Sequence, residues 1–294
     1  YGKPEGNGGH DQRVHRLMKR TLFNELSEYR DSGFYPFHMP GHKRRLSPEG
    51  LEAIYGMDIT EIDGFDNLHD ACGILADMQS EAADLFHSEE THFLVNGSTC
   101  GILAAISAVC RRGDQVLVAR NCHKSVYHAI EVLGLKPVYI YPPLQKCYRS
   151  FTGVYPQIVN KMWIKTANIQ AIILTSPTYE GITSDIQGIV TMAHERGVPV
   201  IVDEAHGAHM TFSEYFPESA VALGADLVVQ STHKTLPMLT QTALLHVNGK
   251  LVNRERLRHM LGVYQTSSPS YVLMGSIDAG LKLIRERGDE LFEE

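Results

Sequence analysis

The sequence predicts an α/β protein built on a parallel β-sheet that is covered by helices on both faces. Apolar runs such as AIIL and VPVIV show no polar alternation, which is typical of strands buried on both faces. Each run is followed by a stretch with helical periodicity, and alternating strands and helices indicate a parallel sheet. In such sheets, ligands bind at the carboxyl ends of the strands.

The first quarter of the chain is less regular. Residues 1–15 are rich in glycine and polar side chains, so we expect them to be loose. Residues 18–33 indicate a short helix that ends at Gly33. Residues 34–45 are rich in turn formers, and residues 56–73 carry acids without a clear period, which favours an ordered loop. A helix is expected from about residue 74 to Phe86.

The strand–helix pattern then repeats to the end of the chain. Strands are expected at residues 91–95, 115–119, 136–141, 171–175, 198–203, 225–230 and 242–247. Helices are expected at residues 101–110, 126–134 and 185–197, with a weaker one at 157–167.

Composition bounds the class of protein. The 294 residues are 43% hydrophobic and 21% charged, which fits one large globular domain or two small ones. A net charge of −7 gives no electrostatic reason to expect a nucleic-acid or anionic-membrane partner. The apolar runs are too short to span a bilayer, and no secretion signal is visible, although residue 1 is Tyr, so the natural start could be missing. Five scattered cysteines without a C-x-x-C pair favour free thiols in the cytoplasm over disulfides or a zinc site.

Polar motifs follow five of the expected strands. Because the carboxyl ends of parallel strands meet at one edge of a sheet, we expect these motifs to converge. They are NGST (96–99), NCHKS (121–125), SPTYEG (176–181), DEAHGAH (203–209) and STHK (231–234).

Two of these motifs carry groups that are costly to bury. Asp203 ends a buried strand and needs a cationic partner, for which a protonated pyridine nitrogen is one candidate. Lys234 follows the next strand, and its amine could condense with an aldehyde cofactor. A helix start at NGST suits a phosphate group. These are the parts of a pyridoxal phosphate (PLP) site.

Each part also has a simpler interpretation. NGST could be a plain capped turn, Asp203 a helix cap or an ion-pair partner, and His123 a cap or core residue. DEAH also occurs in helicases, but the chain lacks a P-loop. His206 and His209 are spaced like zinc ligands, but without a supporting ligand pattern.

The motifs also carry a resemblance. HMPGHK (38–43), NGST, NCHKS, SPTYEG, VDEAHGAH (202–209), STHK and TSSPSY (266–271) occur in this order. Together they resemble the ornithine/lysine/arginine decarboxylase family in its shorter bacterial form, over residues 20–290. The resemblance implies the PLP-dependent transferase-like fold (fold type I), with a mostly parallel seven-stranded sheet. It also implies a cytoplasmic homodimer or larger homo-oligomer with its sites at the subunit interface.

The resemblance assigns roles to individual residues. Lys234 would hold PLP as a Schiff base, Asp203 would pair with the ring nitrogen, His123 would stack on the ring, and His206 would lie beside it. Lys234 or a nearby histidine would return a proton to Cα. The cofactor-binding set is completed by phosphate contacts from Gly97, Ser98, Thr99, Ser231 and His233, and by Thr266 and Ser267 from a segment that a neighbouring subunit lends.

The implied reaction is decarboxylation of lysine, arginine or ornithine to the amine and CO₂, in polyamine metabolism. The expected substrate contacts are His42 and Tyr179 together with the acidic loop, which supplies Glu61, Asp63, Asp66 and Asp70. That loop could equally be a solvated acidic surface. Two alternatives stay open: an aminotransferase or aldolase on the same fold, and a non-catalytic PLP-binding partner subunit.

The resemblance also divides the chain. Residues 1–55 would be an N-terminal arm and helix, residues 56–265 the PLP-binding large domain, and residues 266–294 an interface segment with the start of a C-terminal region. Family members usually continue past this point, so the chain could be a fragment, a processed piece or a short form.

Overall fold

The computed structural model describes residues 21–145, 147 and 149–293. In this part of the chain, seven strands form one sheet in the order β1–β9–β8–β7–β6–β2–β3. Only β9 runs against its two neighbours; the other pairs are parallel. The strands are β1 (Glu90–Leu94), β2 (Gln115–Ala119), β3 (Lys136–Ile140), β6 (Ile169–Thr175), β7 (Val200–Asp203), β8 (Leu227–Gln230) and β9 (Ala243–Val247). The predicted mostly parallel sheet is confirmed.

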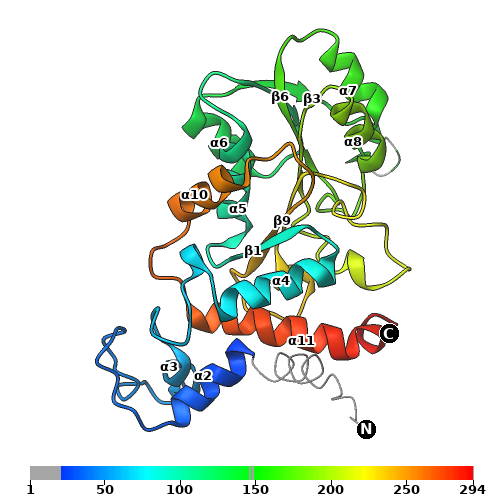
Figure 1. Ribbon diagram of the computed structural model, residues 1–294. Coiled ribbons are helices and arrows are strands. Elements are labelled where there is room, and N and C mark those ends of the chain that lie inside the picture. The colour runs from blue at the N-terminus through cyan, green and yellow to red at the C-terminus, as the bar shows by residue number, and fades with distance from the viewer. Residues whose placement is uncertain (1–20, 146, 148, 294) are drawn as a thin grey trace, which may run out of the picture.

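Helices cover both faces of this sheet. In Figure 1, α5 (Gly97–Val109), α6 (Lys124–Leu133) and α10 (Arg254–Tyr264) lie on one side of the strands. On the other side lie α7 (Pro156–Trp163) and α8 (Ile186–His194). A large hydrophobic cluster joins the two layers through the strands, and the central side chains of the inner strands β2, β6, β7 and β8 are buried. Burial on both faces explains why the strands show no polar alternation.

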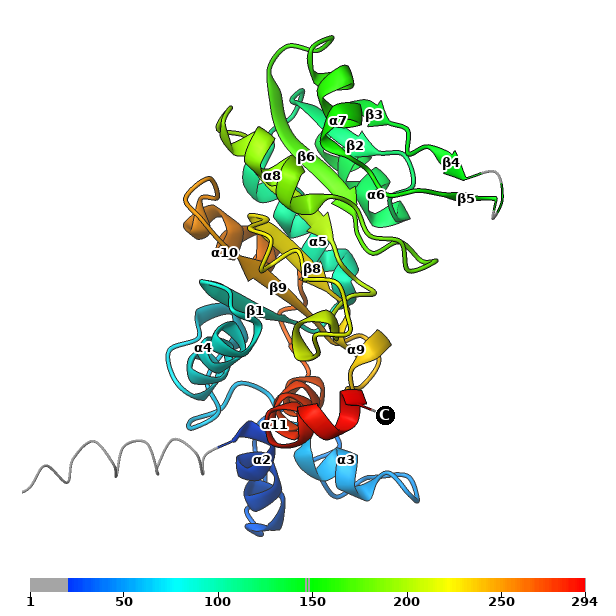
Figure 2. The same ribbon diagram turned by 90° about the vertical axis from the view of Figure 1, so that its right-hand side faces the viewer.

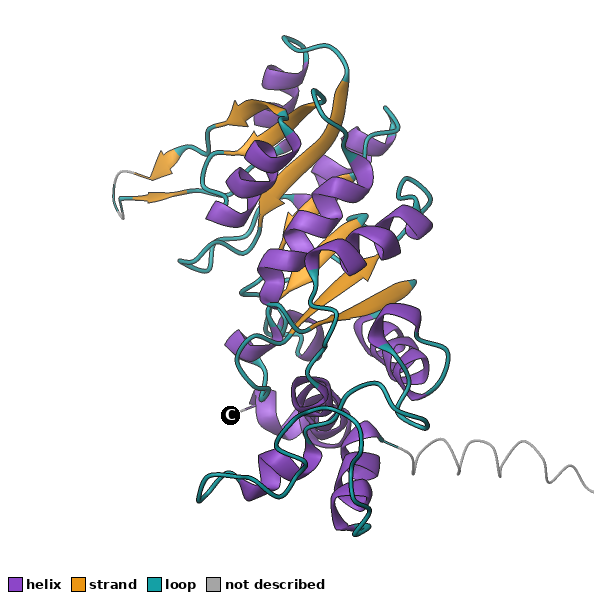
Figure 3. Cartoon of the chain, turned by 90° about the vertical axis from the view of Figure 1, so that its left-hand side faces the viewer, coloured by secondary structure: helices purple, strands orange, loops and turns teal. Residues whose placement is uncertain are grey.

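A second hydrophobic cluster packs against one end of the sheet, through Phe93 of β1 and Leu244 of β9. It joins α2 (Leu22–Asp31), α4 (Ile74–Phe86) and α11 (Tyr271–Glu293), and α3 (Glu52–Met57) packs beside them. In Figure 3 the part of the molecule around α11 is built of helices and loops, and the other part is built around the strands. The N-terminal helices and the last helix therefore share one core. The predicted domain boundaries stay a prediction.

Several elements differ from the expected ones. The helix after NGST begins at Gly97 instead of residue 101, so the motif is part of its first turn. A two-stranded hairpin of β4 (Leu144–Gln145) and β5 (Ser150–Phe151), visible at the edge of Figure 2, was not predicted. Two 3₁₀ turns were not predicted: η1 (Leu68–Asp70), inside the predicted loop 56–73, and η2 (Met210–Phe212). The expected loose residues 1–15 lie outside the described residues.

All five cysteines are free thiols. Within the described part of the chain, no helix combines the length and apolar character needed to cross a membrane.

Candidate active site

The carboxyl ends of β6, β7 and β8 lie side by side. Asp203 is the last residue of β7 and pairs in register with Thr175 of β6 and Val229 of β8. Beyond them, the Ser176 N–H donates a hydrogen bond to the Asp203 carbonyl at 3.1 Å. Three of the five polar motifs, SPTYEG, DEAHGAH and STHK, therefore leave the sheet at one edge.

Asp203 is an almost fully buried acid, with an exposed fraction of 3%. Burial raises its pKa to about 6, while a hydrogen bond from the Ala205 N–H and the charge of Lys234 act in the opposite direction. The Ala205 N–H lies 3.2 Å from Oδ1. A buried carboxylate whose charge is poorly compensated is a good partner for a cationic group.

Lys234 lies in a short helix, α9 (Thr232–Thr235), just beyond the end of β8. A lysine is costly to bury, and Lys234 avoids this cost because it is exposed. Strand β8 is fully buried and ends at Gln230, four residues before Lys234, so the lysine lies beyond the buried part of the strand. The charge of Lys234 acts on Asp203, His123 and His206, which places these four side chains in one electrostatic neighbourhood.

The two histidines differ in their local tasks. His123 is the N-cap of α6, and its Nδ1 accepts a hydrogen bond from the Ser125 N–H at 3.3 Å. Burial first, and then the charge of Lys234, lower the pKa values of both His123 and His206. The ring of Tyr179 stands edge-on to the His206 ring, with 5.6 Å between centroids. Both imidazoles are therefore neutral near pH 7 and lie at the open edge of the sheet.

The first turn of α5 lacks a side-chain cap. Asn96 is its N-cap but bonds no N–H of the helix, because its Oδ1 accepts instead from the Thr266 N–H at 3.0 Å. Gly97 has a φ of +73°, and its N–H donates to the Gln241 carbonyl at 2.9 Å. The helix start therefore presents N–H groups without a side-chain cap.

The STHK motif meets this turn through a neighbouring loop. His233 donates from Nδ1 to the Thr242 carbonyl at 2.7 Å, next to the Gln241 that holds Gly97. The Ser231 hydroxyl is buried and has no hydrogen-bond partner among the described residues. A buried hydroxyl without a partner is costly, so Ser231 has a free polar atom to offer a bound group.

The acidic loop and the TSSPSY segment contact each other. The Thr266 carbonyl accepts from His69 Nε2 at 2.8 Å, and the Tyr271 hydroxyl donates to the Asp66 carbonyl at 2.6 Å. Thr266 is therefore bonded to both the loop and the NGST turn of its own chain. The expectation that a neighbouring subunit lends Thr266 and Ser267 stays a prediction.

The expected substrate contacts are not equivalent. Asp66 accepts hydrogen bonds from four backbone N–H groups of its own loop, which lower its pKa although burial raises it. His42 is bonded to Asp58 at 3.1 Å. Glu61 and Asp63 are exposed and Tyr179 is 85% exposed. These last three side chains are open to solvent, although Glu61 accepts a hydrogen bond from Thr60, whereas Asp66 and His42 are held by structural partners.

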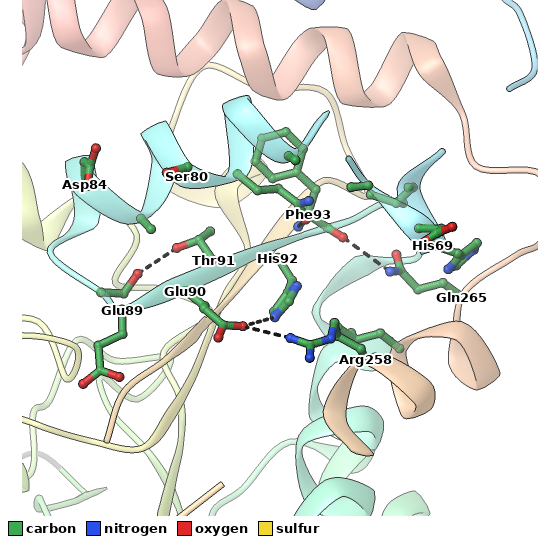
Figure 4. Close-up of a pocket in the computed structure, with 18 residues that line it drawn as sticks. His69, Ser80, Asp84, Glu89, Glu90, Thr91, His92, Phe93, Arg258 and Gln265 are labelled. Atoms are coloured by element: carbon green, nitrogen blue, oxygen red, sulfur yellow. Dashed lines mark hydrogen bonds and ion pairs between the residues drawn. The ribbon is translucent and has the colours of Figure 1, made fainter. Parts of the chain in front are cut away.

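A separate cavity of about 520 Å³ lies beside β1, the strand at one lateral edge of the sheet (Figure 4). It is lined by Thr91, His92 and Phe93 of β1, by residues of α4, and by Arg258 of α10. Glu90 pairs with His92 at 3.5 Å and with Arg258 at 3.6 Å. Of the predicted site residues, the lining holds only Asp70 of the acidic loop.

Sequence reasoning missed Glu204. It follows Asp203 directly, is 1% exposed, and accepts hydrogen bonds from Ser219 and Gln230. The sequence did carry a signal for it, because Glu204 is a second acid at the end of the same buried strand, directly after Asp203.

The fold and the cluster at the sheet edge define a class of protein. The chain has the α/β fold of the fold type I enzymes that use PLP. It belongs to a particular family within that class, because the model described as "Orn/Lys/Arg decarboxylase, major domain" matches residues 20–294.

Individual relatives agree with this family. The chain is 41% identical over 267 residues to the uncharacterized protein YaaO of Bacillus subtilis, covering 89% of this chain and 56% of that protein. It is 35% identical over 279 residues to the arginine decarboxylase of Bacillus anthracis, covering 93% and 57%. The lysine decarboxylase LdcF of Francisella novicida shares the fold, with a TM-score of 0.81, 23% identity, and coverage of 98% and 45%. The chain thus spans about half the length of the curated relatives it matches.

Proposed function

We propose that this chain carries the active-site domain of a PLP-dependent decarboxylase, which converts lysine, arginine or ornithine to the amine and CO₂. We place this activity in polyamine metabolism and, on the basis of its free thiols, in the cytoplasm. The observation that carries the proposal is the buried carboxylate of Asp203 within range of the charge of Lys234, at the carboxyl ends of the strands in a chain of this family.

The residues present fit the cofactor. A buried carboxylate at Asp203 suits a protonated ring nitrogen, and an exposed amine at Lys234 lies within electrostatic range of it. The uncapped start of α5 and the unpaired Ser231 hydroxyl suit a phosphate. The NGST and STHK motifs would thus hold the phosphate arm of PLP, and Asp203 would hold the ring nitrogen. A flat ring with a phosphate arm needs contacts at both of these ends.

Each side chain then has a task. Bound PLP supplies an electron sink for carbon–carbon cleavage. Lys234 would be its covalent attachment point, and Asp203 would hold the proton on the ring nitrogen. His123, neutral near pH 7, suits stacking against an aromatic ring. His206 would lie beside that ring, and either it or Lys234 would return a proton to the substrate carbon.

The distal end of a basic substrate needs an acidic contact. Glu61 and Asp63 are exposed in the acidic loop and would supply it, with Tyr179 at the rim of the site. Hydrogen bonds, chiefly from Thr60, lower the pKa of Glu61, so it is ionised at neutral pH. An ionised carboxylate suits either an ammonium or a guanidinium group.

A substrate panel tests the proposal. The PLP-loaded chain is given lysine, arginine or ornithine separately, and CO₂ and the amine are measured. We expect equimolar CO₂ and amine from at least one of the three. Formation of a keto acid without CO₂ would instead favour an aminotransferase. PLP binding with no product from any of the three would favour the non-catalytic partner subunit.

We also propose that two copies of the chain associate. The candidate site is open, since Lys234, His123 and Thr99 are all exposed, and a second subunit would cover it. Residues 34–46 also present a row of exposed apolar side chains, namely Phe34, Tyr35, Phe37, Met39 and Leu46. Contiguous exposed apolar surface is typical of interaction sites.

We expect Phe37→Glu to weaken this association by about tenfold or more, because the charge would be buried at the interface. Phe37 is 91% exposed in the single chain, so its replacement does not disturb the fold. Sedimentation velocity over a concentration series gives the dissociation constant. Ile164→Glu is the control, because Ile164 is also exposed, at 73%, and lies just after α7. A monomeric wild-type chain, or equal effects of both variants, would contradict the assignment.

A further inference from the structure

A buried acid lies behind the candidate site. Glu204 follows Asp203, and because successive residues of a strand point to opposite faces, the two carboxylates point away from each other. Burial raises the pKa of Glu204 to about 7. The Glu204 N–H donates to the Val229 carbonyl at 2.9 Å, which extends the β7–β8 pairing by one bond.

Donors surround this carboxylate. Oε1 accepts from the Ala220 N–H, and Oε2 accepts from the Ser219 hydroxyl and from Nε2 of Gln230, all at 2.7 Å. Hydrogen bonds from three donors favour the ionised form and oppose the effect of burial. The carboxylate is thus fully satisfied although it is buried.

The hydrogen bonds continue across the sheet in one direction. Because Gln230 donates its amide to Glu204, its Oε1 accepts from Nε2 of His246 at 3.1 Å. His246 is neutral, since burial lowers its pKa to about 3, so its Nδ1 must accept from the Thr91 hydroxyl at 2.8 Å. Thr91 in turn accepts from Ser88 at 2.8 Å. One set of donors and acceptors therefore links β7, β8, β9 and β1.

Within this network, the bond between Glu204 and Gln230 joins the ends of β7 and β8. Gln230 is the last residue of β8, and α9, which carries Lys234, begins two residues later. Glu204 directly follows the residue that ends β7. The bond therefore ties together the two strand ends that carry the Asp203 carboxylate and the Lys234 amine.

We propose that Glu204 is a positioning residue for the cofactor site: through its hydrogen bond to Gln230, it fixes the separation between the Asp203 carboxylate and the Lys234 amine. The inference rests on the proposed function, because the two groups must hold opposite ends of one PLP ring. Its effect is on geometry, since the Glu204 side chain faces away from the site.

Two variants separate this role from general stabilisation. Gln230→Met and Ser219→Ala each remove one hydrogen bond to the same atom, Oε2 of Glu204. Each also removes one further acceptor, that of His246 Nε2 in the first variant and that of the Val221 N–H in the second. Only the first variant removes the side-chain bond between the two strand ends, whose backbone pairing remains. We expect Gln230→Met to weaken PLP binding by about tenfold, the effect of losing one hydrogen bond to a charged group, and to shift the absorption band of bound PLP. Ser219→Ala should change PLP affinity by less than about twofold.

The outcomes are read from PLP titrations together with melting temperatures. Lower melting temperatures in both variants, with weaker PLP binding only in Gln230→Met, support the inference. Equal losses of PLP affinity in the two variants, or no loss in either, overturn it. If the wild-type chain itself fails to bind PLP, the proposed function fails, which is a different result from wild-type binding that Gln230→Met leaves unchanged.

Glu204→Gln provides a second test that does not depend on the folding of Gln230→Met. The new amide can accept from the Ala220 N–H and donate to Oε1 of Gln230 once that side chain has rotated. His246 must then accept at Nε2 and donate from Nδ1, which nitrogen NMR of the PLP-free protein detects as the opposite tautomer. Because the strands stay tied, PLP affinity should remain within about threefold of wild type. An inverted tautomer with a tenfold loss of affinity would overturn the inference.

Discussion

Replacement of Lys234 by alanine is expected to lower the decarboxylation rate by at least about 10³-fold and to abolish covalent attachment of PLP. The amine is the only lysine group whose charge acts on Asp203, His123 and His206 together in the described part of the chain. Alanine removes both the attachment point and a candidate proton donor. The fold should survive, because Lys234 is exposed.

Lys124→Ala is the matched control. Lys124 is also exposed, and its charge also acts on His123, but it lies at the start of α6 and not beside Asp203. Borohydride reduction of the PLP-loaded protein, followed by peptide mass spectrometry, should place the label on residue 234 in wild type and in Lys124→Ala. A label on another lysine, or retention of label in Lys234→Ala, would show that the site lies elsewhere.

Local patterns predicted most of the fold. The helix at residues 74–86 was predicted with its observed bounds, because apolar residues recur there at helical spacing. The antiparallel direction of β9 was not predicted. An apolar run such as ALLHV indicates a buried strand but not its direction, which is decided by pairing with β1 and β8. The β4–β5 hairpin was missed because its strands are only two residues long.

The site was predicted unevenly for a similar reason. Strand-end motifs located Asp203 and Lys234, because the carboxyl ends of neighbouring parallel strands must meet. Sequence could not show that Lys234 is exposed, since this depends on the short helix α9 that contains it, which was not predicted. The bonds of Glu204 were not predictable either. They join residues that are 15 and 26 positions apart, and depend on which strands pair.

Asp203→Asn is expected to have opposite effects on stability and on activity. In the PLP-free protein, burial raises the pKa of Asp203 from 3.8 to about 6. The folded state then holds its proton more tightly than the unfolded state, so this group's contribution to stability is complete below pH 4 and is lost as the pH rises through 6. The loss amounts to about 2–3 kcal/mol at pH 7, at roughly 1.4 kcal/mol per pKa unit. Asparagine carries no charge at any of these pH values, so the variant avoids this loss of stability.

The same substitution should slow the reaction. A neutral amide does not hold a proton on the ring nitrogen of PLP as a carboxylate does, and loss of such electrostatic stabilisation lowers rates by about 10²-fold or more. We therefore expect a PLP-free variant that melts at a higher temperature than wild type at pH 7 to 8, with no such gain near pH 4, and whose PLP-loaded form is slow. Calorimetry across this pH range and turnover with the preferred amino acid measure the two effects.

Asp278→Asn separates these two effects. Asp278 is also buried, at 8% exposure, and burial raises its pKa as well. It lies in α11, however, and accepts a hydrogen bond from the Phe23 N–H at 2.9 Å. This variant should alter the pH dependence of stability and leave turnover within about twofold of wild type. If Asp203→Asn also kept wild-type turnover, the carboxylate at 203 would not face the ring nitrogen. The charge of Asp203 would then affect stability through its burial and would have no effect on the reaction.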